Sequence, residues 1–325
     1  MDNIVEVENL KKWFNLRGGF LDILMGKKVY VKAVDGISFN IVRGEVLALV
    51  GESGCGKTTV GRTLLNLVEK TDGKVIVDGY DFDDLKKDDE FNFHRKAQII
   101  LQDPFGSLNP RTTIGGCIAE PIRVHKLAKN REEMDKMVIN AMQTVNLVPV
   151  EDIINKYPNE LSGGQMQRVA IARTMVLNPT FLVCDEPVSM LDASIQANIL
   201  NLFISIREEL GLTILFITHD LAVAKYISDR IAVMYLGKIV EMGDTDSIVE
   251  NPQHPYAKAL FSAVRSPNPN IKLGKIEIKG EVPNPIDLPP GCRFYPRCPY
   301  AEEICRELEP ELIKKDGQLV ACHKA

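Results

Sequence analysis

The sequence lacks the features that would place it in a membrane or on nucleic acid. No apolar run approaches the ~20 residues that a membrane-spanning helix requires. The formal net charge is -5, so the chain has no basic footprint of the kind that nucleic-acid-binding proteins carry. Residues 1–6 show neither the basic nor the apolar region of a signal peptide. We therefore expect a cytosolic protein that binds no nucleic acid and relies on other chains for any membrane spans.

Cysteine pairs of the CxxC type are absent from the end of the chain, although cysteine itself is not rare. Four of the 7 cysteines are crowded there: Cys292, Cys298, Cys305 and Cys322. Their spacing, Cys-x5-Cys-x6-Cys-x16-Cys, differs from that of the common zinc ribbons. Because cytosolic thiols stay reduced, the cluster favours a metal site over disulfides. Four thiolates can hold either zinc or an iron–sulfur cluster, and the ligand count leaves both open.

What the sequence does contain is a phosphate-binding loop at residues 51–58, Gly-Glu-Ser-Gly-Cys-Gly-Lys-Thr. It follows a short apolar run at 46–50 and precedes apolar residues at helical spacing over 59–68. Strand, glycine-rich turn and helix is the context that such a loop requires. The glycines let backbone N–H groups surround an anionic oxygen, and the helix N-terminus adds partial positive charge. Lys57 would reach the β- and γ-phosphates of a nucleoside triphosphate, and the Thr58 hydroxyl would ligate Mg²⁺.

Three further apolar runs, at 97–101, 180–187 and 213–217, are predicted to form buried strands. Polar side chains suited to triphosphate hydrolysis lie at their ends: Gln102, Asp185, Glu186 and His219. After a phosphate loop, Asp185 is the natural partner of Mg²⁺, and Glu186 is the natural residue to polarise an attacking water. Gln102 can offer its amide oxygen to a metal ion or hold a water.

A second helix N-terminus suited to an anion lies at residues 161–165, Leu-Ser-Gly-Gly-Gln. Ser162 is predicted to cap a helix over 169–177, and the two glycines let backbone amides approach an anion closely. The residues between 105 and 160 predict a helical insertion between strands of the sheet. Two such helix ends on one chain cannot easily reach the same nucleotide.

Shorter strands are predicted near the N-terminus and after the last buried strand. They cover 4–7, 29–34, 36–41 and 74–77, and a hairpin of 230–235 with 238–241. Trp13 and Phe14 follow the first strand, where an exposed aromatic ring would stack on adenine and a half-buried one would edge the core. Prolines and turn residues from 266 to 290 predict a linker or an extended arm.

Together these motifs resemble those of ATP-binding subunits of ABC transporters, over nearly the whole chain. The specific mark is the signature at 161–165, after a helical insertion and shortly before the second carboxylate-bearing strand. The resemblance implies an α/β fold: a P-loop NTPase (RecA-like) core, an antiparallel β subdomain, a helical signature subdomain and a cysteine-rich C-terminal extension. It places the ATPase domain at 1–250, the helical subdomain at about 103–177 and the extension at 251–325.

The resemblance also implies the site residues. Glu186, His219, Gln102 and Lys57 would be catalytic, and Thr58, Gln102 and Asp185 would hold Mg²⁺. The residues implied to contact ATP are Phe14, Gly51, Ser53, Gly54, Cys55, Gly56, Lys57, Thr58, Thr59, Gln102, Asp185, Ser162, Gly163, Gly164, Gln165 and Asp192. In this family two subunits pack head to tail, so the signature of one would close on the ATP held by the other.

The C-terminal part resembles the tail of dipeptide and oligopeptide importers. Its marks are residues 251–257, Asn-Pro-Gln-His-Pro-Tyr-Ala, and residues 291–300. Residues 13–14, 18–20 and 32–39 resemble the F-type partner of the usual D/F pair. Some members carry a [4Fe–4S] cluster on this tail, which favours a cluster over Zn²⁺ on the four cysteines. Nickel importers share much of the tail, so a nickel importer stays an alternative.

The resemblance implies several partners at the cytoplasmic face of the membrane. They are a second ABC ATPase (a D-type chain or a copy of this one), two transmembrane permease subunits and, indirectly, an extracytoplasmic peptide-binding protein. Two alternatives remain: a soluble ABC ATPase outside transport, and an ATPase gated by the redox state of the tail. The first is disfavoured by the single cassette, the short insertion and the acidic balance.

Overall fold

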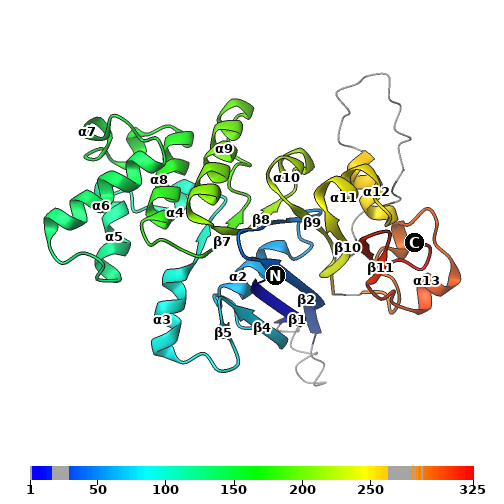
Figure 1. Cartoon of the computed structure of the whole chain (residues 1–325). Helices are drawn as coiled ribbons and strands as arrows, with labels where there is room; N and C mark the ends of the chain where they lie inside the picture. The colour runs from blue at the N-terminus through cyan, green and yellow to red at the C-terminus, as the bar shows by residue number, and fades with distance from the viewer. Residues whose placement is uncertain are drawn as a thin grey trace. The chain divides into compact units, whose positions relative to one another are not determined.

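The computed structural model describes residues 2–16, 29–262 and 288–325, with single residues 278, 280, 283, 285 and 286 (Figure 1). The chain divides into two compact units. The first comprises Met1–Ile4, Ile41–Glu45 and Asp78–Phe216, and the second Val5–Asn40, Val46–Val77 and Ile217–Ala325. Residues 18–20 and most of the predicted linker at 266–290 lie outside the described residues.

The first unit contributes neighbouring strands to a sheet. Strand β6 (Ala97–Ile100) pairs in parallel with β7 (Phe181–Asp185), and β8 (Thr213–Thr218) is the next neighbour of β7. Every residue of β7 and β8 is buried. Continuous burial is typical of parallel strands that are covered on both faces, and it confirms the three strands predicted from apolar runs.

Helices make up most of the rest of this unit, which confirms the predicted helical insertion. They are α3 (Lys87–Lys96), α4 (Pro104–Ser107), α5 (Ile114–Val124), α6 (Arg131–Thr144), α7 (Val150–Ile153), η1 (Pro158–Glu160), α8 (Gly163–Met175) and α9 (Ala193–Leu210); β5 (Tyr80–Asp81) precedes them. Helices α5, α6 and α8 contact one another and bury Ile118, Met142 and Met166. None of these three side chains is exposed, so the insertion has a core of its own.

The second unit begins with an antiparallel sheet in the order β2-β1-β4. Strand β1 is Asn3–Leu16, β2 is Val29–Val42, and β4 is Asp72–Val77, antiparallel to β1. Two predictions were wrong here. The predicted strands at 29–34 and 36–41 are one strand, because Gly36 adopts a φ of 77° and bends the chain without ending it. Trp13 and Phe14 lie within β1 rather than after it.

Five further strands of the same unit are neighbours in one sheet, in the order β11-β12-β10-β9-β3. Strand β3 (Val46–Val50) runs parallel to β9 (Arg230–Tyr235), which forms the predicted hairpin with β10 (Lys238–Asp244). The C-terminal strands β12 (Gln318–Val320) and β11 (Ile313–Lys315) extend this sheet beyond β10. Neither strand was predicted from the sequence, although an Asp-Gly pair at 316–317 separates them as in a hairpin turn.

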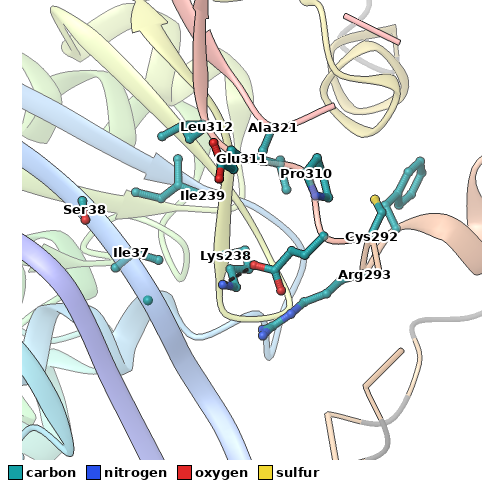
Figure 2. A pocket seen from close by; sticks show the side chains of 14 residues that line it. Ile37, Ser38, Lys238, Ile239, Cys292, Arg293, Pro310, Glu311, Leu312 and Ala321 are labelled. Carbon is teal, nitrogen blue, oxygen red and sulfur yellow. Dashed lines mark ion pairs between the residues drawn. The ribbon is translucent and has the colours of Figure 1, made fainter. Parts of the chain in front are cut away.

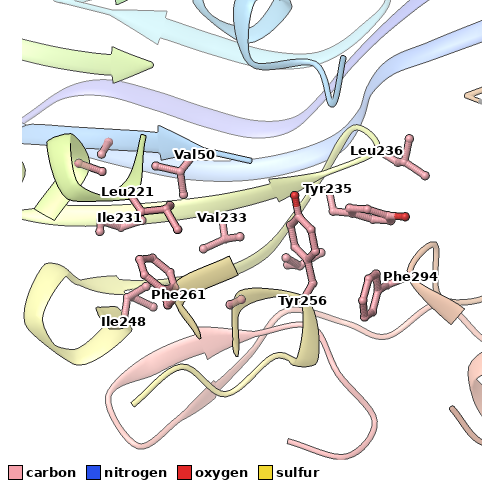
Figure 3. Close-up of a cluster of buried hydrophobic side chains, with 14 residues drawn as sticks. Val50, Leu221, Ile231, Val233, Tyr235, Leu236, Ile248, Tyr256, Phe261 and Phe294 are labelled. Carbon is pink, nitrogen blue, oxygen red and sulfur yellow. The ribbon is translucent and has the colours of Figure 1, made fainter. Parts of the chain in front are cut away.

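The C-terminal tail contributes to the core of this unit. The helices of the second unit are α2 (Lys57–Leu64), α10 (Leu221–Ile227), α11 (Thr245–Glu250), α12 (Pro255–Ser262), η2 (Tyr295–Arg297) and α13 (Glu303–Glu307). Figure 3 shows Phe294 of the tail packed beside Tyr235 of β9 and Tyr256 of α12. The Phe294 ring lies 5.3 Å from that of Tyr235 and 5.4 Å from that of Tyr256.

Candidate functional site

The glycine-rich loop at residues 51–56 connects β3 to α2, as predicted. Gly56 has a φ of 110°, and a Cβ there would lie 2.1 Å from the carbonyl oxygen of Ala33, so only glycine fits. Lys57 begins α2, and its buried Nζ donates to the carbonyl oxygens of Gly51 at 2.8 Å and Glu52 at 3.0 Å. The ammonium group therefore lies inside the loop itself.

The remaining loop residues divide by exposure. Ser53 and Gly54 are exposed, whereas Cys55 is buried and its pKa is raised by that burial. Thr58 and Thr59 lie half-buried in the first turn of α2. That turn contains no acidic residue, so nothing there opposes an anion at the helix N-terminus.

In the first unit, the structure brings Gln102 and Glu186 together. Gln102 follows β6, and its Nε2 donates to Glu186 Oε2 at 3.2 Å and to Ser189 Oγ at 3.3 Å. Asp185 is the buried last residue of β7, and Glu186 turns the chain with a φ of 50°. A left-handed conformation is uncommon outside glycine and is often found at functional sites. Ser189 was not predicted as a site residue, and the one sequence signal for it is its place three residues after Glu186.

The signature residues form a capping box at the start of α8. Ser162 Oγ accepts from the Gln165 N–H at 3.4 Å, and Gln165 Oε1 accepts from the Ser162 N–H at 3.0 Å. Ser162 is therefore the predicted N-cap, but the predicted helix start at 169 was wrong. Because the capping box starts the helix, α8 begins at Gly163. At Gly164 a Cβ would lie 2.7 Å from Ile195 Cγ2, which requires a small residue.

Asp192 caps the next helix, α9. Its Oδ1 accepts from the Ile195 N–H at 3.0 Å and from the Ser194 hydroxyl at 2.8 Å. These hydrogen bonds, the one from Ile195 first, lower the pKa of the Asp192 carboxyl. The carboxylate is exposed and held in one orientation.

The two predicted adenine-stacking candidates differ in their surroundings. Trp13 Nε1 donates to Asp35 Oδ1 at 2.9 Å, and Lys32 Nζ lies 4.7 Å from the indole centre. Phe14 is 41% exposed, with Lys12 Nζ 4.9 Å from its ring centre. Trp13 is thus held by a hydrogen bond and a cation–π contact, whereas the ring of Phe14 is exposed to solvent.

His219 lies directly after β8 and is exposed. Its neighbour Asp220 caps α10, because its Oδ1 accepts from the N–H groups of Ala222 at 2.8 Å and Val223 at 3.2 Å. His219 is therefore anchored between a buried strand and a capped helix, as the sequence analysis expected for a strand-end residue.

The four C-terminal cysteines line one small cavity of about 20 Å³, with His254 at its wall. All seven cysteines of the chain have free thiols. The Cys292 N–H donates to the Cys305 carbonyl at 2.8 Å, and burial raises the pKa of the Cys292 thiol to about 11. Within the described ranges, no group of three or more His, Cys, Asp or Glu side chains is arranged to hold a metal ion. The thiols converge, but a single-ion site is not formed.

Larger cavities lie elsewhere in the described parts of both units. Figure 2 shows a cavity of the second unit, about 250 Å³, whose wall includes an ion pair between Lys238 and Glu309. The first unit has a groove of about 440 Å³ beside β6, α5 and α8. Its wall includes Leu101, the neighbour of Gln102, and the exposed Val124. No helix of the described chain has the length and apolar character needed to cross a bilayer.

Comparisons with known proteins identify both parts of the sequence. A family model described as ABC transporter matches residues 34–189, and one for the oligopeptide/dipeptide transporter C-terminal region matches residues 240–305. The oligopeptide transport ATP-binding protein OppF of Salmonella typhimurium is 46% identical over 99% of this chain and 96% of that protein. The dipeptide transport ATP-binding protein DppF of Haemophilus influenzae is 46% identical over 96% of this chain and 94% of that one.

Solved structures agree with this assignment. A dimeric post-hydrolysis structure of the ATP-binding cassette MJ0796, bound to ADP and Pi, covers 74% of this chain and 98% of its own. Its sequence is 28% identical to this one, and the TM-score is 0.65. The cbiO1 protein of Clostridium perfringens is 27% identical with a TM-score of 0.65, over 77% of this chain and 92% of its own. The chain therefore belongs to the ABC transporter family, among the ATP-binding proteins of oligopeptide and dipeptide transport, and it is an ATP hydrolase.

Proposed function

We propose that this ATP hydrolase powers the import of dipeptides or oligopeptides through a membrane transporter. The observation that carries the proposal is the match of residues 240–305 to the C-terminal region of such transporters, since that region lies outside the part shared with other ABC proteins. Relatives named for oligopeptide and dipeptide transport align along nearly the whole chain, which supports the same substrate class.

Each predicted site residue receives a role in hydrolysis under this proposal. Glu186 polarises the attacking water, and Gln102, hydrogen-bonded to it, holds the water in line. Lys57 and the loop N–H groups neutralise the charge that develops on the phosphates, and His219 fixes the γ-phosphate. Bound Mg²⁺, held by Thr58, Gln102 and Asp185, would supply further positive charge.

The remaining contacts to ATP come from the loop, the signature and Phe14. Residues 51–59 surround the phosphates, and Phe14 stacks on adenine. The signature of a second subunit, a D-type chain or another copy, closes on the same ATP through Ser162, Gly163, Gly164 and Gln165, with Asp192 beside them. The exposure of Ser162 supports such a role, because its capping box leaves it accessible at a helix N-terminus.

We also assign a docking surface for the transmembrane permease subunits to the groove beside α5 and α8. Val124 in the groove wall is 56% exposed, and Phe105, in the same short helix α4 as the wall residue Ser107, is 52% exposed. Apolar side chains exposed beside a groove are typical of a protein interface. A permease loop seated there would bind this subunit to the cytoplasmic face of the membrane and sense the state of Gln102.

For the four C-terminal cysteines, the resemblance to peptide importers favours a [4Fe–4S] cluster, with a single zinc ion as the alternative. The observation that supports a shared ligand is that all four thiols line one cavity. A cluster would be ligated by Cys292, Cys298, Cys305 and Cys322 and would tie the tail segments together. Iron, sulfide and zinc analysis of anaerobically purified protein tests this. About four irons per chain are expected, and one zinc with no iron would contradict the cluster.

Transport is tested by reconstitution with the permease pair, the second ATPase and the peptide-binding protein in vesicles. ATP-dependent uptake of a labelled dipeptide is expected, and uptake of labelled nickel instead would contradict the peptide assignment. Val124→Glu should retain ATP hydrolysis and lose uptake, because a charge in the groove blocks docking. Ile139→Glu, at an exposed site on α6 outside the groove, is the matched control and should transport normally.

A further inference from the structure

The second residue of the phosphate loop, Glu52, brings a negative charge into a segment that binds an anion. Its carboxylate is held by the C-terminal tail: Arg297 donates through one terminal nitrogen to Oε2 at 2.7 Å and through the other to Oε1 at 3.1 Å. The Arg297 side chain is 9% exposed and that of Glu52 27%. A paired, largely buried fork of this kind is stronger than a surface ion pair.

The backbone of the same residue is held by a second contact from the tail. The Glu52 N–H donates to the Tyr256 hydroxyl at 2.9 Å. The carbonyl of Glu52 in turn accepts from Lys57 Nζ at 3.0 Å. Glu52 is therefore fixed at its N–H, its carbonyl and its carboxylate, and two of these three contacts come from residues outside the ATPase motifs.

The residues that hold Glu52 are themselves fixed in the core. Tyr256 is fully buried, and its N–H donates to His254 Nδ1 at 3.1 Å; the His254 N–H donates to the buried Glu241 of β10 at 2.8 Å. The Arg297 guanidinium lies 5.8 Å from the ring centre of Tyr235. The motif at 251–257 and the cysteine-rich tail thus each contribute a residue that hydrogen-bonds to the phosphate loop.

We propose that Arg297 and Tyr256 are positioning residues for the phosphate loop, and that they act through Glu52. Arg297 neutralises the Glu52 carboxylate, which would otherwise repel the phosphates of ATP. Tyr256 holds the Glu52 backbone, so the carbonyl to which Lys57 donates stays in place. This inference rests on the proposed role of residues 51–58 in binding ATP.

The test compares ATP affinity and turnover in the full-length protein. Arg297→Gln leaves the carboxylate without its cation and should raise KM for ATP about tenfold, the size expected for losing hydrogen bonds to a charged group, with kcat within about twofold. Adding Glu52→Gln removes the repelling charge and should restore most of the affinity. Arg131→Gln, an exposed arginine on α6, is the control and should change neither constant.

A purely structural role makes the opposite prediction. If Arg297 only anchored the tail, the double variant would bind ATP as poorly as Arg297→Gln or worse, and the inference would be overturned. Tyr256→Phe keeps the ring in the core and removes the hydroxyl, so it should raise KM severalfold with little change in melting temperature. An unchanged KM in folded Tyr256→Phe would overturn the part played by that residue.

The failure of the underlying proposal has a different signature. Lys57→Ala should abolish binding of a fluorescent ATP analogue whether or not the tail positions the loop. Unchanged binding in Lys57→Ala would show that residues 51–58 are not the ATP site. Lost binding in Lys57→Ala, with unchanged KM in the Arg297 and Tyr256 variants, would refute only the positioning role.

Discussion

Replacing Phe294 by alanine tests whether the C-terminal tail is part of the unit that carries the phosphate loop. The Phe294 side chain is 1% exposed and lies against the rings of Tyr235 and Tyr256 (Figure 3). The His254 ring lies 5.7 Å from that of Phe294. Truncating a buried phenylalanine costs about 3–5 kcal/mol, because the site cannot fully collapse around the cavity. That is a large share of a typical stability of about 5–15 kcal/mol.

The assay uses the only tryptophan of the chain, Trp13, which lies in β1 of the same unit. Its fluorescence during guanidinium unfolding should show a clearly lower midpoint for Phe294→Ala. Leu308→Ala, at a tail position that is 56% exposed, is the control and should change stability by less than about 0.5 kcal/mol. If both variants unfold at the wild-type midpoint, the tail is not packed into this core and the reasoning fails.

Two further predictions concern a buried carboxyl group and a loop glycine. Burial raises the pKa of Glu241 from 4.5 to about 7, so the folded protein keeps a proton that the unfolded chain has released. The retained proton contributes up to about 3 kcal/mol to the free energy of unfolding. This contribution is fully present below pH ~4.5 and is lost as the pH rises through 7. Glu241→Gln should therefore gain stability relative to wild type between pH 5 and 8 in urea unfolding, and a constant difference would contradict this. Gly56→Ala should destabilise the protein far more than Gly54→Ala, since both have positive φ but only the first places its Cβ 2.1 Å from a carbonyl oxygen. Equal melting temperatures would contradict that difference.

The buried strands and the ATPase motifs were predictable because their physics is local. Strands β7 and β8 are continuous apolar runs, and such runs remain buried whatever surrounds them. Ser162 was predicted to cap a helix because an N-cap hydroxyl bonds a backbone N–H only two or three residues further along the chain. The predicted helix start at 169 is too late, because the capping box of Ser162 and Gln165 already begins α8 at Gly163.

The contributions of the tail were not predictable from sequence, because they depend on residues far apart in the chain. Arg297 and Glu52 are 245 residues apart, and neither has a local pattern that points to the other. Strands β11 and β12 are three residues each, too short to show alternation, so the Asp-Gly turn between them is their one local signal. The motif at 251–257 indicates a family by its sequence, but the hydrogen bond between Tyr256 and the phosphate loop depends on the fold.

The hydrolysis of ATP is tested most directly by Glu186→Gln in steady-state turnover. Glutamine keeps the shape of the side chain and can still contact Gln102, but it cannot accept a proton from water. We predict that turnover falls by about 10²–10⁴-fold while ATP affinity stays within a few fold of wild type. Wild-type turnover in folded Glu186→Gln would contradict the assignment of the catalytic base at the end of β7.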